Sequence, residues 1–198
     1  AGAAGAGPGA MTQGAAAPLP RQAPPAAFAD GPWRDAASAA LSHAPYLKRL
    51  IERRPDLLDG ADAADWPERR VREAIAAAHA IIAAPPPLDD GMRTLRRAKD
   101  AVHLAVAIAD LARAWPLMAV TGALTDFADA ALRAALSLGA QESARRGDFV
   151  CGAGDDETGP APGVALIAMG KMGAGELNYS SDIDFSVFFE TERLAAAK

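Results

Sequence analysis

The sequence predicts an α+β protein in which a helical N-terminal part is followed by the start of a mixed sheet. Between residues 33 and 146, apolar side chains recur every three or four residues, which is the period of amphipathic helices. After residue 163 this period changes. The run from Val164 to Met169 is short and wholly apolar, as is typical of a strand buried on both faces. Residues 183–189 predict a second strand with its apolar side chains on one face.

Composition divides the chain into four parts. Residues 1–32 are rich in Ala, Gly and Pro and hold almost no large apolar side chain, so a disordered tail is expected. Residues 33–146 form the predicted helical region, and residues 147–162 a loop rich in Gly, Asp and Pro. Residues 163–198 begin the sheet domain. Because large apolar residues are concentrated after Leu88, we expect the core to lie there.

The helical region predicts an antiparallel bundle. Its four main helices are expected near residues 45–55, 67–84, 89–115 and 120–138. Pro45 and Pro67 each stand at a helix start, where proline costs no backbone hydrogen bond. Pro116 ends or kinks the third helix, and Thr121 or Thr125 is expected to cap the fourth.

Charge and cysteine content exclude several classes of function. A net charge of −5 argues against a broad nucleic-acid surface, which needs clustered cations. The densest basic cluster is interpreted as the solvated face of a helix, and it comprises Arg93, Arg96, Arg97 and Lys99. Cys151 is the one cysteine, so neither an internal disulfide nor a paired-cysteine metal site can form. The sequence shows no membrane-spanning run and no secretory signal, and we expect a cytoplasmic location.

Two carboxylates near the C-terminus predict a metal site. Asp182 and Asp184 are two residues apart on the predicted second strand, so their side chains should project from the same face. Two negative charges this close repel each other, and a divalent cation is the natural compensation. Hard oxygen ligands suit Mg²⁺, or alternatively Mn²⁺. We therefore predict both residues to be catalytic metal ligands.

Phosphate-binding groups precede this pair. Gly170 and Gly173 permit a tight turn after the first strand, where backbone amides can face an anion. Lys171, Ser180 and Ser181 add donors near the same place. The pattern is neither a P-loop nor a dinucleotide fingerprint, because the glycine spacing differs from both. Hydrogen-bond donors for a phosphate group, placed beside paired carboxylates, indicate phosphoryl or nucleotidyl transfer.

The stretch from Gly170 to Gly173, followed by Glu176 to Asp184, resembles the signature of the glutamine synthetase adenylyltransferase family. This family belongs to the DNA polymerase beta-like nucleotidyltransferase superfamily. The resemblance implies two such domains in one chain. One attaches AMP to a tyrosine of glutamine synthetase, and the other removes it by phosphorolysis, which releases ADP. Asn178 and Ser180 resemble the removing domain, whereas the attaching domain tends to carry glycine at both positions.

The resemblance also implies partners and missing parts. Glutamine synthetase and the nitrogen-signal protein PII are the implied protein partners, and nucleotide and phosphate the implied ligands. A third metal carboxylate on a later strand completes the superfamily site, and no aspartate follows Asp184 in this chain. We therefore expect a truncated nucleotidyltransferase domain that is inactive by itself.

Three alternatives stay open at this point. The same chemistry could run in the attaching direction, with ATP as the AMP donor. The helices could form a regulatory module that binds glutamine synthetase or PII without turnover. The chain could also be an unrelated nucleotidyltransferase of the same superfamily.

Overall fold

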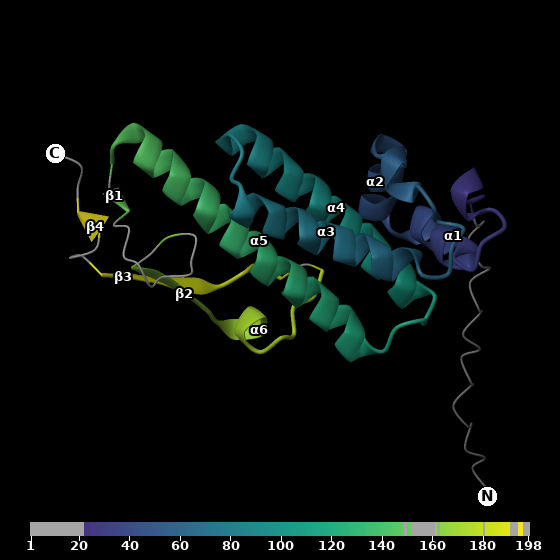
Figure 1. Ribbon diagram of the computed structural model, residues 1–198. Helices are drawn as coiled ribbons and strands as arrows, with labels where there is room; N and C mark the ends of the chain where they lie inside the picture. The colour runs from purple at the N-terminus through teal and green to yellow at the C-terminus, as the bar shows by residue number, and fades with distance from the viewer. Residues whose placement is uncertain are drawn as a thin grey trace, which may run out of the picture.

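A computed structural model describes residues 22–148, 150–151, 161, 163–179, 181–190 and 194–195. The fold is mostly helical with short antiparallel strand pairs, which confirms the α+β class (Figure 1). In chain order, the helical elements are η1 (Ala26–Phe28), α1 (Arg34–His43), α2 (Pro45–Arg53), η2 (Pro55–Leu58), α3 (Trp66–Ala83), α4 (Leu88–Leu111), α5 (Leu117–Arg146) and α6 (Gly170–Gly173). The strands are β1 (Val150–Cys151), β2 (Val164–Ala168), β3 (Phe185–Phe189) and β4 (Leu194–Ala195).

Helices α3, α4 and α5 lie side by side and contact one another in all three pairs (Figure 1). Pro45 begins α2 as predicted, and Pro67 lies in the first turn of α3. Helix α4 ends at Leu111 rather than Trp115, because Arg113 adopts a left-handed φ of 55° and turns the chain. Among the described residues, every helix is either too short or too polar to cross a bilayer.

The predicted threonine caps of the fourth helix are wrong. Helix α5 begins at Leu117, directly after Pro116, so Thr121 and Thr125 lie inside it. The Thr125 hydroxyl donates to the carbonyl of Thr121 at 2.8 Å, which is one helical turn back. A proline at the N-cap position starts this helix without a side-chain cap.

Many buried positions of α3, α4 and α5 hold small side chains. The buried alanines of these helices are Ala74, Ala78, Ala98, Ala105, Ala107, Ala109, Ala130 and Ala134. Gly91 in α4 faces Leu138 in α5, and a Cβ placed at Gly91 would lie 2.5 Å from the Leu138 Cδ2 atom. Because Leu138 is only 2 % exposed, it has little room to move away. The helices therefore pack at a distance that a larger residue at Gly91 would not allow.

A second part of the core lies before Leu88, contrary to expectation. Phe28 is completely buried, and its ring meets that of Trp66 edge-on at a centroid distance of 5.5 Å. Trp33 and Leu50 belong to the same cluster. The expected disordered tail is thus wrong for residues 22–32, because Trp66 offers a surface to an otherwise isolated aromatic residue. Residues 1–21 lie outside the described part of the chain.

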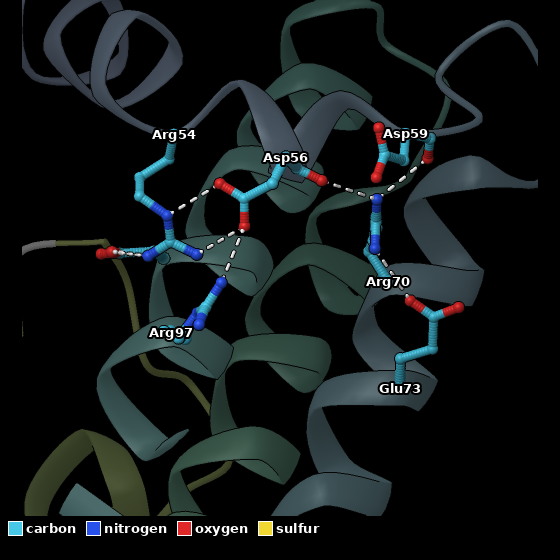
Figure 2. Close-up of polar contacts among 7 residues, drawn as sticks. Arg54, Asp56, Asp59, Arg70, Glu73 and Arg97 are labelled. Atoms are coloured by element: carbon cyan, nitrogen blue, oxygen red, sulfur yellow. Dashed lines mark hydrogen bonds and ion pairs between the residues drawn. The ribbon is translucent and has the colours of Figure 1, made fainter. Parts of the chain in front are cut away.

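An ion-pair network ties η2 to the long helices (Figure 2). The Asp56 carboxylate accepts hydrogen bonds from Arg54 at 2.9 Å and from Arg97 of α4 at 3.3 Å. The Arg54 hydrogen bond is the main reason why the pKa of Asp56 falls to about 2. Arg70 of α3 donates to the backbone carbonyls of Asp56 and Asp59. Arg97 is exposed, as predicted for the basic cluster, and it also forms an ion pair with Asp56.

The strands differ from the prediction in burial and extent. Strands β2 and β3 pair antiparallel, with Val164 opposite Phe189 and Ala168 opposite Phe185. Side chains of β2 alternate between half-buried and exposed, and Ile167 is 52 % exposed, so burial on both faces is wrong. The described residues add no further strand to this pair. Both described pairings are antiparallel, so the mixed sheet stays a prediction.

The expected loop at residues 147–162 contains a strand. Cys151 and Val150 form β1, which pairs antiparallel with β4. Residues 152–160 and 162 lie outside the described part of the chain. The predicted loop is therefore wrong at β1 and stays a prediction for the rest.

The Gly91 contact generates a prediction on stability. Overpacking of a core costs about 1–3 kcal/mol, more than the roughly 0.5–1 kcal/mol gained by removing a helical glycine. Gly91→Ala should therefore lower the free energy of unfolding by about 1 kcal/mol, measured by urea titration followed by circular dichroism. Gly139→Ala is the matched control, because a Cβ there meets nothing within 4 Å, and it should raise stability. Equal effects of the two changes would contradict the close contact.

Candidate functional site

The predicted glycine turn is present and joins the two strands. The Met169 amide donates to the Asp184 carbonyl at 2.8 Å, which extends the β2–β3 pairing by one step. Gly170 has a left-handed φ of 54°, and a Cβ there would lie 3.2 Å from the Asp184 Oδ2 atom. A Cβ on Gly173 would lie 2.7 Å from the Ala168 carbonyl oxygen. Both positions therefore require glycine, and the turn holds Asp184 beside Gly170.

The backbone amides of this turn differ in their freedom to bind an anion. The Gly173 amide donates to Met169 at 3.0 Å, and the Ala174 amide donates to Gly170 at 3.1 Å. These amides close the turn and are already satisfied. The amides of Gly170 to Met172 lie at the start of the helix, where backbone amides have no carbonyl acceptor within the helix. Lys171 lies in the same short helix with an exposed side chain.

The two predicted metal ligands lie before β3 rather than on it. Asp182 and Asp184 are both exposed, and the strand begins at Phe185. Asp182 lines a groove against the helices, whereas Asp184 lines an open hollow of about 560 Å³ beside Gly170. Ile183 lines both depressions. The predicted placement of the pair on a strand is therefore wrong, because β3 begins only at Phe185, the residue after Asp184.

The donor chemistry of this segment suits a hard divalent cation in part. Within the described residues, neither Asp182 nor Asp184 forms an ion pair, so both carboxylates can accept a cation. Two exposed carboxylates are ligands that Mg²⁺ accepts. However, no cluster of three or more acidic, His or Cys side chains that could hold a metal occurs in the described part of the chain.

A hydrogen-bonded turn shapes the segment just before the carboxylates. The Ser181 hydroxyl donates to the Asn178 side-chain oxygen at 2.9 Å, and the Ser181 amide donates to the Asn178 carbonyl at 3.2 Å. The Ser181 side chain, which the sequence predicted to bind phosphate, therefore closes this turn. Ser180, the other predicted donor, lies outside the described residues.

Apolar anchors dock the turn and the following segment on the helices. Met172 and Leu177 are each 4 % exposed and pack in a cluster with residues of α3, α4 and α5 such as Phe127. The Leu177 amide donates to the Thr125 hydroxyl of α5 at 3.2 Å. Sequence reasoning missed Leu177 and gave Thr125 a different role, because no local pattern marks a contact between residues 52 positions apart.

Tyr179 extends this docking to α4. Its hydroxyl donates to an Asp110 carboxylate oxygen at 3.5 Å, and its ring meets His103 edge-on at 6.5 Å. Tyr46 lies against His103 with a ring distance of 6.2 Å. Burial, reinforced by the negative charge of Asp110, raises the pKa of Tyr179. Burial, reinforced by the positive charge of Lys99, lowers the pKa of His103 to about 4.

The shifted pKa of His103 predicts how stability depends on pH. The unfolded chain protonates this ring near pH 6.5, whereas the folded chain does so only near pH 4. The contribution of neutral His103 to the free energy of unfolding should therefore be fully present above about pH 6.5 and be lost as the pH falls toward 4. Urea unfolding at pH 7.5 and 5.0 should show a smaller drop for His103→Gln than for the unchanged chain. His79→Gln, at an exposed position of α3, is the control and should keep the full drop.

Comparison with known proteins places this chain in a family. The glutamate-ammonia ligase adenylyltransferase family matches residues 35–198. The chain is 44 % identical over 169 residues to the bifunctional glutamine synthetase adenylyltransferase/adenylyl-removing enzyme of Caulobacter vibrioides, which covers 85 % of this chain and 17 % of that protein. The enzyme of the same name from Rhizobium meliloti is 42 % identical over 173 residues, covering 82 % of this chain and 17 % of that protein.

A shorter match is more similar still. The enzyme of the same name from Xanthobacter autotrophicus is 50 % identical over 109 residues, covering 54 % of this chain and 11 % of that protein. No solved structure matches the chain significantly. The chain thus spans about a sixth of the length of the first two relatives. The family match and these identities show that the chain belongs to the glutamate-ammonia ligase adenylyltransferase family.

Proposed function

We propose that this chain carries part of an adenylyl-removing site. The reaction is phosphorolysis of the AMP–tyrosine bond on glutamine synthetase, which yields unmodified glutamine synthetase and ADP and so regulates nitrogen assimilation. The observation that carries the proposal is the glycine turn that holds Asp184 beside Gly170. The names of the relatives, which include both adenylyltransferase and adenylyl-removing activities, support the chemistry.

The proposed domain is a DNA polymerase beta-like nucleotidyltransferase with a mixed sheet that extends beyond β2 and β3. Asp182 and Asp184 would hold Mg²⁺ or Mn²⁺, with a further ligand from outside the described residues. When bound, the cation would neutralise charge on the phosphoryl oxygens. Both carboxylates are exposed and form no ion pair with another described residue, which supports this role.

The reaction needs little acid catalysis from the protein. An oxygen of orthophosphate attacks the phosphorus of AMP–tyrosine, and the bond from phosphorus to the tyrosyl oxygen breaks. The phenolate then takes a proton from water. Because a phenol has a pKa near 10, it leaves more readily than an alkoxide. The main tasks are to bring two anions together and to orient them. Lys171 supplies a positive charge for this, and the first amides of α6 supply hydrogen-bond donors.

The direction of the reaction is proposed from two side chains. Asn178 and Ser180 favour removal, and Asn178 helps to build the turn that precedes the carboxylates. The alternative is the attaching direction, in which ATP donates AMP and pyrophosphate leaves. Its support is that the printed names of the relatives include both activities.

Glutamine synthetase is the proposed substrate partner, and PII a proposed regulatory partner, in the cytoplasm. An interaction module without turnover is the remaining alternative. Because the chain matches about a sixth of the relatives, catalysis is best tested in a longer enzyme that contains it. The 198-residue chain by itself is expected to be inactive, since two carboxylates alone position a cation poorly.

Mutation of the site should separate metal binding from phosphate binding. Asp182→Asn and Asp184→Asn keep the side-chain shape but remove the charge that holds a cation. Each should lower kcat by several orders of magnitude. Lys171→Ala should chiefly raise KM for phosphate, because this cation meets the phosphate in ground and transition states alike. The assay follows ADP release from adenylylated glutamine synthetase with phosphate and Mg²⁺.

A longer enzyme with its second catalytic domain inactivated is the required background for this assay. ADP release at the normal rate by both aspartate variants would show that the carboxylates are structural. Formation of pyrophosphate from ATP, without release of ADP, would instead support the attaching direction. Binding of glutamine synthetase without either product would favour the interaction module.

A further inference from the structure

The groove beside Asp182 is a second feature of this region. It has a volume of about 460 Å³ and lies between α4, α5 and the segment from Leu177 to Ile183. Its volume falls within the range of small-molecule sites, about 300–1,000 Å³. The groove opens on the helical side of the carboxylate segment, whereas the hollow beside Gly170 and Asp184 involves the strand ends.

The floor of the groove is apolar. Phe127, Ala131 and Leu132 of α5 form it together with Leu95 of α4. Phe127 is held in place by burial, and Ala131 adds only a methyl group to the lining. A floor of this kind suits a flat aromatic ring system rather than a hydrated ion.

One wall of the groove carries two cations. Arg96 and Lys99 of α4 line it with exposed side chains, and neither forms an ion pair within the described residues. Arg93 and Arg97 of the same basic cluster differ, since they pair with Asp90 and Asp56. Arg96 and Lys99 thus bring to the groove lining two positive charges that an anionic ligand would neutralise.

From this combination we infer that the groove binds the adenosine monophosphate part of the adenylylated substrate. The adenine ring lies on the Phe127–Ala131–Leu132 floor, and the phosphate lies between the α4 cations and Asp182. The adenosine thus enters from the helical side of the carboxylate segment, and the hollow beside Gly170 is left for the attacking phosphate. This inference rests on the proposed function and adds the location of the nucleoside.

Two kinds of variant test the two halves of the inferred site. Ala131→Trp fills the floor and should weaken binding of both ADP and adenosine at least tenfold. Arg96→Glu combined with Lys99→Glu reverses the wall charge, and should weaken ADP binding at least tenfold while leaving adenosine binding within twofold. Isothermal titration of the purified 198-residue chain with ADP and with adenosine, each with Mg²⁺, measures these effects.

Matched controls lie outside the groove. Ala119→Trp adds the same side chain to an exposed position of α5, and Arg133→Glu reverses an exposed charge on the same helix. Both should leave ADP binding unchanged. Circular dichroism checks that each variant keeps its helices, and the double charge reversal at exposed positions tests the site even if Ala131→Trp unfolds the chain.

The outcomes separate this inference from the proposed function. Unchanged ADP affinity in both groove variants, or no ADP binding by the unaltered chain, would overturn the inference. Phosphorolysis by the longer enzyme would still support the proposed function in that case. Conversely, groove-dependent ADP binding together with an inactive longer enzyme would support the nucleotide site and refute the phosphorolysis.

Discussion

Close packing of α3, α4 and α5 through small side chains is the constraint on which the rest of the structure depends. Each buried alanine removes little apolar surface from water, so its main effect is to let the helices approach closely, whereas larger buried side chains such as Leu104 and Ile108 supply most of the buried apolar surface. Gly91 against Leu138 marks the tightest approach that we find among the described glycines of these helices. The spacing of α4 and α5 in turn sets the width of the groove that Lys99 and Phe127 line.

The candidate site takes its position from this helical surface as much as from the strands. Met172 and Leu177 are buried against the helices, and Leu177 also donates to Thr125. At the other end, the Met169–Asp184 hydrogen bond ties the segment to the β2–β3 pair. Asp182 lies between these two anchors and lines the groove against the helices, whereas Asp184 lines the hollow beside Gly170. Two aspartates that are only two positions apart in the sequence thus meet different surroundings.

Local features of this protein were predictable from the sequence because their physical causes are local. Pro45 begins α2 since its fixed φ suits a first helical turn, and Gly170 begins the turn after β2 because its φ is left-handed. The change from a helical to a strand-like period after residue 163 was also predictable, and with it the α+β class. The residues around Asp182 and Asp184 were sufficient to indicate the family that the comparisons then showed.

Contacts between distant segments were decided by the tertiary structure alone. The sequence by itself determined which faces are apolar, but it did not state which partner each face meets. Phe28 is buried because Trp66 lies opposite it. Likewise, Thr125 accepts from Leu177 rather than capping its helix. In each case the deciding partner is far away in the chain, and periodicity carries no information about such partners.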